Sequence, residues 1–169
     1  RQRRLMCGIA GVFYADSSRS VGPSLLTDMG NAIAHRGPDG EGIFRSGPVG
    51  LVHRRLAIID LDGGRQPLSN EDESIHVVFN GEIYNYQELR QKLVARGHKF
   101  RTKSDTEVLV HLYEEYGSEL CSHLRGMFAF AIWDARRHQL LLARDHLGQK
   151  PLFIYRDHEK LIFGSELKA

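Results

Sequence analysis

A cysteine near the start of the chain has the chemistry of a nucleophile. Cys7 stands in the run Met6-Cys7-Gly8-Ile9. If residues 1–6 are removed, this cysteine carries a thiol and a free α-amine on one carbon, and the amine can take the thiol proton. A free α-amine has a pKa of about 7.7–8.0, close to neutrality. The alternative is a small cysteine buried at the start of a strand, and these residues alone do not decide between the two.

Further short motifs that hold polar and charged residues follow along the chain. In order, they are His35-Arg36-Gly37-Pro38-Asp39, His53-Arg54-Arg55-Leu56-Ala57-Ile58, Asn80-Gly81-Glu82-Ile83-Tyr84-Asn85, Ser104-Asp105-Thr106-Glu107, Gly126-Met127-Phe128-Ala129-Phe130, Ala143-Arg144-Asp145-His146-Leu147-Gly148-Gln149-Lys150-Pro151-Leu152 and Ser165-Glu166-Leu167-Lys168-Ala169. Any one of these motifs is a weak signal, so their order over one domain length carries the information.

The pattern of apolar residues predicts the elements that position these motifs. We expect a helix over residues 24–35, closed by a Gly-Pro-Asp-Gly loop. Two more helices are expected after capping boxes, Asn85 with Glu88 and Ser104 with Glu107. Strands are expected over 8–14, over two segments within 42–55, over 77–79 up to a turn at Asn80-Gly81, and over 127–133, 139–143, 152–155 and 161–163. Strands at both ends with helices between predict a layered α+β domain rather than a parallel βαβ sheet.

Composition excludes several classes of protein. The 169 residues fit one domain, and the 23 basic and 21 acidic residues leave a net charge of only +2, so no nucleic-acid partner is expected. The longest apolar run, residues 127–133, is too short to span a bilayer, so no membrane association is expected. Two cysteines make no disulfide framework and indicate a cytoplasmic location. The nine histidines lack recognised metal-ligand spacings, and no glycine-rich phosphate loop occurs.

Taken together, the motifs closely resemble the glutaminase domain of class II glutamine amidotransferases, and within that group the N-terminal half of glutamine-hydrolysing asparagine synthetases. The resemblance extends from Met6 to Ala169. It implies a four-layer αββα sandwich, in which two antiparallel sheets are flanked by helices, as in N-terminal nucleophile hydrolases. It also implies a leader or processed segment over residues 1–6, a glutaminase domain over 7–169, and a C-terminal synthetase domain that is absent from this chain.

The resemblance assigns a role to each candidate site residue. Cys7 is the nucleophile, and the Asn80 side-chain amide and the Gly81 backbone N–H form the oxyanion hole. Arg55 binds the substrate α-carboxylate, and Asp105, with Glu82 as a second acceptor, binds the α-ammonium group. The remaining residues, which line the glutamine pocket, are Leu56, Ala57, Ile58 and Ile59. Without a role in substrate binding, Arg55 would be a surface arginine at a strand end, and Asp105 would be a carboxylate that stabilises a helix N-terminus.

The implied activity is hydrolysis of L-glutamine to glutamate and ammonia through a γ-glutamyl thioester. The ammonia then serves a synthetase domain of the same full-length chain, where ATP and Mg²⁺ activate aspartate for asparagine biosynthesis. The glutaminase domain itself is expected to need no cofactor and no metal, and a homodimer is left open. The alternatives are a synthetase with a different acceptor, a non-catalytic regulatory domain, and a hydrolase of another amide. The last is disfavoured because other amides lack the free amino-acid end that Arg55 and Asp105 would bind.

The residues before Cys7 conflict with this mechanism. With residues 1–6 in place, the α-amine is held in a peptide bond and cannot act as a base. Either processing removes these residues, or the start of the chain is artificial, or the chain is inactive. The resemblance favours one of the first two.

Overall fold

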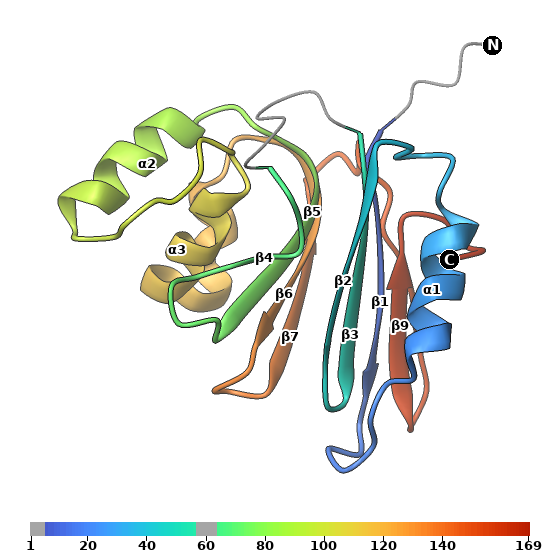
Figure 1. Ribbon diagram of the computed structural model, residues 1–169. Helices are drawn as coiled ribbons and strands as arrows, with labels where there is room; N and C mark the ends of the chain where they lie inside the picture. The colour runs from blue at the N-terminus through green and yellow to red at the C-terminus, as the bar shows by residue number, and fades with distance from the viewer. Residues whose placement is uncertain (1–5, 57–63) are drawn as a thin grey trace.

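Two antiparallel β-sheets lie face to face, and helices cover the outer face of each (Figure 1). The computed structural model describes residues 6–56 and 64–169. The first sheet has the strand order β2-β3-β1-β9-β8, and the second has the order β4-β5-β6-β7. Helix α1 lies outside the first sheet, and α2 and α3 lie outside the second. The predicted four-layer αββα sandwich is therefore confirmed.

The first sheet is built around its strand nearest the N-terminus. Its elements are β1 (Gly8–Tyr14), α1 (Pro23–Ala32), β2 (Gly40–Ser46), β3 (Val49–Arg55), β8 (Phe153–Arg156) and β9 (Lys160–Gly164). Strand β1 is central, because β3 pairs with one edge and β9 with the other. Gly8 pairs with Arg54, so the residue before β1 and the last residue of β3 meet at one end of the sheet. This register places Cys7 beside Arg55.

The second sheet carries the longer helical layer. Its elements are β4 (Leu68–Ser69), β5 (Ile75–Ile83), α2 (Tyr86–Ala95), α3 (Glu107–Tyr116), the 3₁₀ helix η1 (Gly117–His123), β6 (Gly126–Asp134) and β7 (Gln139–Arg144). The prediction of a turn at Asn80-Gly81 was wrong, because β5 continues through both residues and pairs with β6 as far as Ile83. A Cβ at Gly81 would collide with the backbone of Met127 and Phe128. Glycine is therefore required there by close strand packing, and not by a hairpin.

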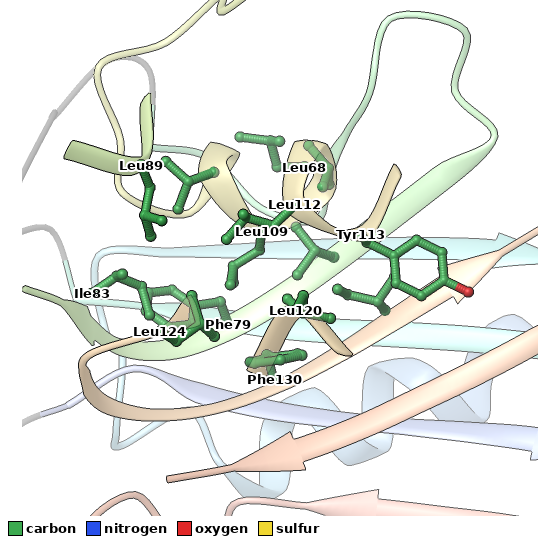
Figure 2. Close-up of a cluster of buried hydrophobic side chains, with 14 of the residues drawn as sticks. Leu68, Phe79, Ile83, Leu89, Leu109, Leu112, Tyr113, Leu120, Leu124 and Phe130 are labelled. Carbon is green, nitrogen blue, oxygen red and sulfur yellow. The ribbon is translucent and has the colours of Figure 1, made fainter. Parts of the chain in front are cut away.

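Alternation along the strands divides the apolar residues into three layers. Between the sheets lie Ile9, Leu51, Val78 and Trp133, among others. The outer face of the second sheet packs against α2, α3 and η1 in the largest cluster, whose labelled members are Leu68, Phe79, Ile83, Leu89, Leu109, Leu112, Tyr113, Leu120, Leu124 and Phe130 (Figure 2). A third cluster packs α1 against the first sheet. Successive residues of β5 thus face opposite layers, with Val78 inside and Phe79 outside.

In both predicted capping boxes, the polar side chains make contacts other than the expected helix caps. Asn85 precedes α2 as expected, but its side chain bonds the carbonyl of His123 at 2.9 Å and the N–H of Arg125 at 2.9 Å. Glu107 begins α3 and accepts hydrogen bonds from the N–H groups of Arg101 and Thr102, at 2.7 Å each. These polar side chains therefore secure neighbouring loops and not the helix ends themselves. The helices exist where predicted, because their apolar faces cover the sheet.

The remaining differences are small. Helix α1 ends at Ala32, short of the predicted His35, because the chain turns through i→i+3 hydrogen bonds such as that from Arg36 N to Ile33 O at 3.0 Å. The two-residue strand β4 was not predicted. Across the described ranges 6–56 and 64–169, no helix is long and apolar enough to cross a membrane.

Candidate active site

A cavity of about 80 Å³ opens where the two sheets meet the loop before α3. Cys7 comes from the start of β1, Arg55 from the end of β3, and Gly81 and Glu82 from β5. Asp105 comes from the loop that precedes α3. Four separate segments thus bring most of the predicted site residues to one place.

The thiol of Cys7 is held by the backbone of Leu56. The Leu56 N–H donates to Cys7 Sγ at 3.3 Å, and the Leu56 carbonyl lies 3.6 Å from the same sulfur. Arg36 fixes the other side of this residue, because its Nε donates to the Cys7 carbonyl at 3.1 Å. The guanidinium of Arg36 in turn pairs with Glu166 at 3.2 Å. The Cys7 side chain and backbone are therefore both held by hydrogen bonds.

The surroundings of the Cys7 thiol favour its protonated form. Burial raises the pKa of Cys7, although the Leu56 N–H and the positive charges of Arg55 and Lys150 act in the opposite direction. A thiol whose pKa is raised needs a base to become a nucleophile. The α-amine that removal of residues 1–6 would expose lies on the same residue and is suited to that task.

Asn80 carries a side chain suited to stabilise negative charge. By alternation it shares the inward face of β5 with Val78, and it is not among the residues that line the cavity. The Asn80 side chain is 1% exposed, and its amide nitrogen has no hydrogen-bond partner within the described part of the chain. A buried amide nitrogen without a partner is a donor that remains able to bind a new hydrogen-bond acceptor. Gly81 lines the cavity itself.

Two neighbouring arginines at the end of β3 serve different purposes. Arg54 points to the α1 side, where its Nε donates to the Gly30 carbonyl at 2.9 Å and its guanidinium pairs with Glu41 at 3.2 Å. Arg55 faces the cavity. Strand alternation separates the two side chains, and Arg55 is the one that lines the cavity.

Asp105 supplies the cavity with a buried carboxylate. Its Oδ2 accepts a hydrogen bond from the Ile83 N–H at 3.0 Å, and the residue is 8% exposed. Burial raises the pKa of Asp105, and the negative charge of Glu82 acts in the same direction. A cation in the cavity would relieve both effects, so this carboxylate is suited to bind an ammonium group.

The predicted pocket segment after Arg55 is only partly visible. Leu56 lines the cavity as expected, whereas Ala57, Ile58 and Ile59 lie outside the described residues. Sequence reasoning missed His53, which also lines the cavity. Its place two residues before Arg55 on one strand face was the available signal. Burial lowers the pKa of His53 to about 3, so its imidazole is neutral.

Gln66 and Thr106 are two further lining residues that the sequence analysis missed. Gln66 Oε1 accepts from the Phe79 N–H at 2.6 Å, and its Nε2 donates to Thr106 Oγ1 at 3.3 Å. The side chain of Gln66 thus joins β5 to the loop that carries Asp105. No motif marked this residue in advance, because its role depends on two segments meeting in space.

The fold is that of a solved amidotransferase. A solved structure of glutamine phosphoribosylpyrophosphate amidotransferase from Bacillus subtilis has the same fold, with a TM-score of 0.75 and 24% identity over 95% of this chain and 42% of that chain. A structure described as the allosteric regulatory enzyme of purine biosynthesis matches with a TM-score of 0.77 and 25% identity over the same shares.

The chain belongs to the glutamine amidotransferase domain family, whose model matches residues 6–169. It is 48% identical over 166 residues to asparagine synthetase [glutamine-hydrolyzing] 1 of Bacillus subtilis (strain 168), covering 97% of this chain and 26% of that protein. It is 44% identical over 149 residues to asparagine synthetase [glutamine-hydrolyzing] 1 of Arabidopsis thaliana, covering 88% and 25%. The chain thus spans about a quarter of the length of these relatives. The resemblance found in the sequence is confirmed.

Proposed function

We propose that this domain hydrolyses L-glutamine to glutamate and ammonia, with Cys7 as the nucleophile. The observation that supports this most strongly is the meeting of a thiol, a guanidinium and a buried carboxylate in one cavity. Glutamine carries a carboxylate and an ammonium group on its α-carbon and an amide at its other end. Arg55 and Asp105 match the two charges, and Cys7 is left to meet the amide.

The first half of the reaction forms a thioester. The Cys7 α-amine, freed by removal of residues 1–6, takes the thiol proton, and the sulfur attacks the side-chain amide carbon of glutamine. The carbonyl electrons move to the oxygen, and the Asn80 amide and the Gly81 N–H donate to that oxyanion. The carbon–nitrogen bond then breaks, and the protonated amine returns its proton to the leaving nitrogen. Ammonia and a γ-glutamyl thioester on Cys7 result.

The second half restores the enzyme. The amine accepts a proton from a water molecule that attacks the thioester carbonyl, and the same donors stabilise the second oxyanion. The carbon–sulfur bond breaks, glutamate leaves, and the thiol regains its proton. Each step uses groups of this domain and one water molecule, so we propose that glutamine hydrolysis requires no cofactor.

We further propose that the ammonia supplies a synthetase domain of a longer protein. The support is that the relatives are named asparagine synthetases and are about four times as long as this chain. In that domain ATP with Mg²⁺ would activate the carboxylate of aspartate, and ammonia would complete asparagine. A cytoplasmic location accords with the two free cysteines at positions 7 and 121.

The test is glutamate release from L-glutamine by a chain that begins at Cys7. We expect release that obeys saturation kinetics and that is abolished by Cys7→Ala. A matched control is Cys121→Ala, which removes the other free cysteine outside the cavity and should retain activity. No glutamate from a folded protein with a verified N-terminal Cys7 would refute the proposal. Simple acyl amides in place of glutamine test the need for the α-carboxylate and α-ammonium groups.

A further inference from the structure

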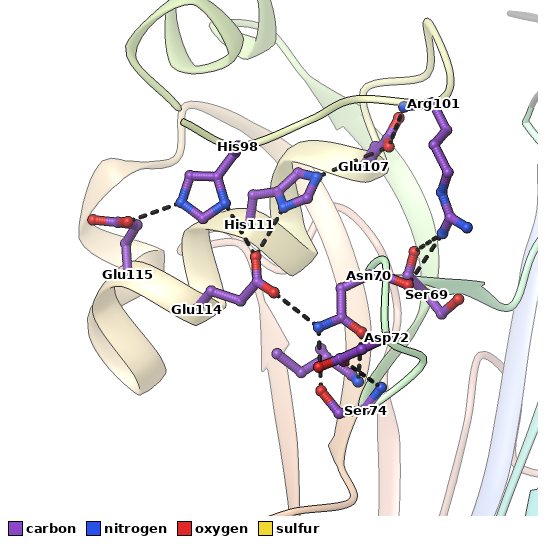
Figure 3. Close-up of polar contacts among 11 residues, drawn as sticks. Ser69, Asn70, Asp72, Ser74, His98, Arg101, Glu107, His111, Glu114 and Glu115 are labelled. Carbon is purple, nitrogen blue, oxygen red and sulfur yellow. Dashed lines mark hydrogen bonds and ion pairs between the residues drawn. The ribbon is translucent and has the colours of Figure 1, made fainter. Parts of the chain in front are cut away.

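A cluster of histidine and glutamate side chains lies on α3, apart from the glutamine cavity. His111 and Glu114 belong to α3, and His98 comes from the loop after α2 (Figure 3). One ligand-type atom from each of the three lies within 4.8 Å of the other two. We propose that His98, His111 and Glu114 bind a zinc ion. This site is independent of the proposed glutaminase function.

The spacing of the three groups suits a common ion. Glu114 Oε2 lies 2.9 Å from His111 Nδ1 and 3.2 Å from His98 Nδ1. Atoms that each lie about 2.0–2.2 Å from one zinc ion are separated by about 3–3.5 Å. Two imidazole nitrogens and one carboxylate oxygen form a common zinc ligand set, and a water molecule can complete the tetrahedron.

Each of these side chains also has a partner on its outer side. The other nitrogen of His98, Nε2, lies 2.8 Å from Glu115 Oε1. The other oxygen of Glu114 accepts from Asn70 Nδ2 at 2.8 Å, and His111 Nε2 faces Glu107 Oε1 at 3.9 Å. Metal-binding histidines usually donate their second N–H to a carboxylate, which orients the ring. The same arrangement occurs at His98, whereas His111 Nε2 makes no hydrogen bond within the described residues.

Hydrogen bonding leaves neutral His98 with more acceptors than donors. His98 presents both nitrogens to carboxylates, and a neutral imidazole has only one N–H to donate. A zinc ion between Nδ1 and Glu114 would let neutral His98 keep its N–H for Glu115. The three glutamates at positions 107, 114 and 115 supply negative charge around a dication. A nitrogen that binds zinc cannot also carry a proton, so zinc affinity should rise with pH.

The ion would join two segments that carry the glutamine cavity. His98 lies in the loop that continues to Asp105, and His111 and Glu114 lie one to two turns into α3. Glu107 holds the middle of the same loop through the N–H groups of Arg101 and Thr102. Zinc would therefore stabilise the α2–α3 connection. Sequence spacing did not reveal the cluster, because His98 and His111 lie 13 positions apart, outside the recognised motifs.

Zinc titration of the metal-stripped 169-residue chain tests the proposal. All proteins carry Cys7→Ser, because a thiolate would compete for zinc. Calorimetry should give one zinc ion per chain, with Mg²⁺ giving no heat, and zinc should raise the midpoint of thermal unfolding. His98→Ala and Glu114→Gln should each weaken binding by more than about 100-fold, since loss of an outer partner alone costs about 10–100-fold. Glu115→Gln should fall within that smaller range.

His158→Ala is the matched control, because its side chain is 89% exposed and lies outside the cluster. It should bind zinc as tightly as the parent protein. Circular dichroism verifies that each variant is folded. The proposal is overturned if the parent binds no zinc, or if folded His98→Ala binds zinc with the parent's affinity and shows the parent's thermal shift.

Discussion

Replacing Asn80 with alanine should lower kcat for glutamine hydrolysis and leave the free energy of unfolding almost unchanged. The Asn80 side chain is 1% exposed and its amide nitrogen has no partner among the described residues. Loss of one oxyanion donor typically lowers kcat by about 100–1,000-fold, or about 2.7–4 kcal/mol. We expect a fall of that size in a chain that begins at Cys7, with the KM for glutamine changed only a few-fold, because the interaction is strongest in the transition state.

The free energy of unfolding should change little in the same variant. Burying an unpartnered polar group costs about 1–3 kcal/mol, and removing it relieves that cost. The small cavity left behind acts in the opposite direction, so we expect a net change below about 1 kcal/mol.

Asn70 is the matched comparison, because it is a buried asparagine with partners. Its amide nitrogen donates to Ser74 Oγ at 3.2 Å and to Glu114 Oε1 at 2.8 Å, and its oxygen accepts from the Ile75 N–H at 3.0 Å. At about 1 kcal/mol for each hydrogen bond, Asn70→Ala should lose about 3 kcal/mol in urea unfolding. The reasoning is refuted if folded Asn80→Ala keeps kcat within fivefold of the parent, or if it is destabilised as strongly as Asn70→Ala.

Three further variants test the electrostatics of the cavity. Asp105→Asn should raise the KM for glutamine about 10–150-fold, the value of a charge-assisted hydrogen bond, without destabilising the domain; an unchanged KM would exclude Asp105 as the ammonium ligand. Lys150→Met should raise the pKa of the Cys7 thiol, seen as slower alkylation by iodoacetamide at pH 8, and an unchanged rate would contradict an effect of the Lys150 charge on the thiol. His53 has a folded pKa of about 3 against 6.5 when unfolded, so its contribution to stability is complete above pH 6.5 and is lost toward pH 3. Between pH 6.5 and 5 this amounts to about 2 kcal/mol in urea unfolding, and His53→Gln should remove that part of the pH dependence.

Local sequence patterns were sufficient to predict most of the fold. Gly8–Tyr14 and Val49–Arg55 form strands, as their apolar patterns indicated. A helix was expected after Ser104 and Glu107, and α3 lies there. The turn assigned to Asn80-Gly81 failed because the dipeptide is typical of hairpins, whereas here β6 approaches so closely that only glycine fits. The preference of this dipeptide for a turn was outweighed by packing against β6, which lies more than 40 positions further along the chain.

The candidate site was predicted chiefly by family resemblance, and alternation then explains its geometry. Arg54 and Arg55 are chemically alike, and only their opposite strand faces decide which one meets the cavity. His53, Gln66 and Thr106 could not be assigned in the same way, because their roles arise from contacts between segments that are far apart in the sequence. The cluster of His98, His111 and Glu114 was missed for the same reason.

The contact between Arg36 and Glu166 has a consequence for communication within the molecule. One nitrogen of Arg36 donates to the carbonyl of Cys7, and another contacts the carboxylate of Glu166. Two contacts therefore connect Cys7 to Glu166. Glu166 also meets His35 at 2.9 Å, which leaves this carboxylate shared between two side chains of one turn. Any partner that draws Glu166 away would release Arg36 and, through it, the backbone of Cys7. Displacement of one partly exposed carboxylate would therefore change the position of the thiol through a single arginine.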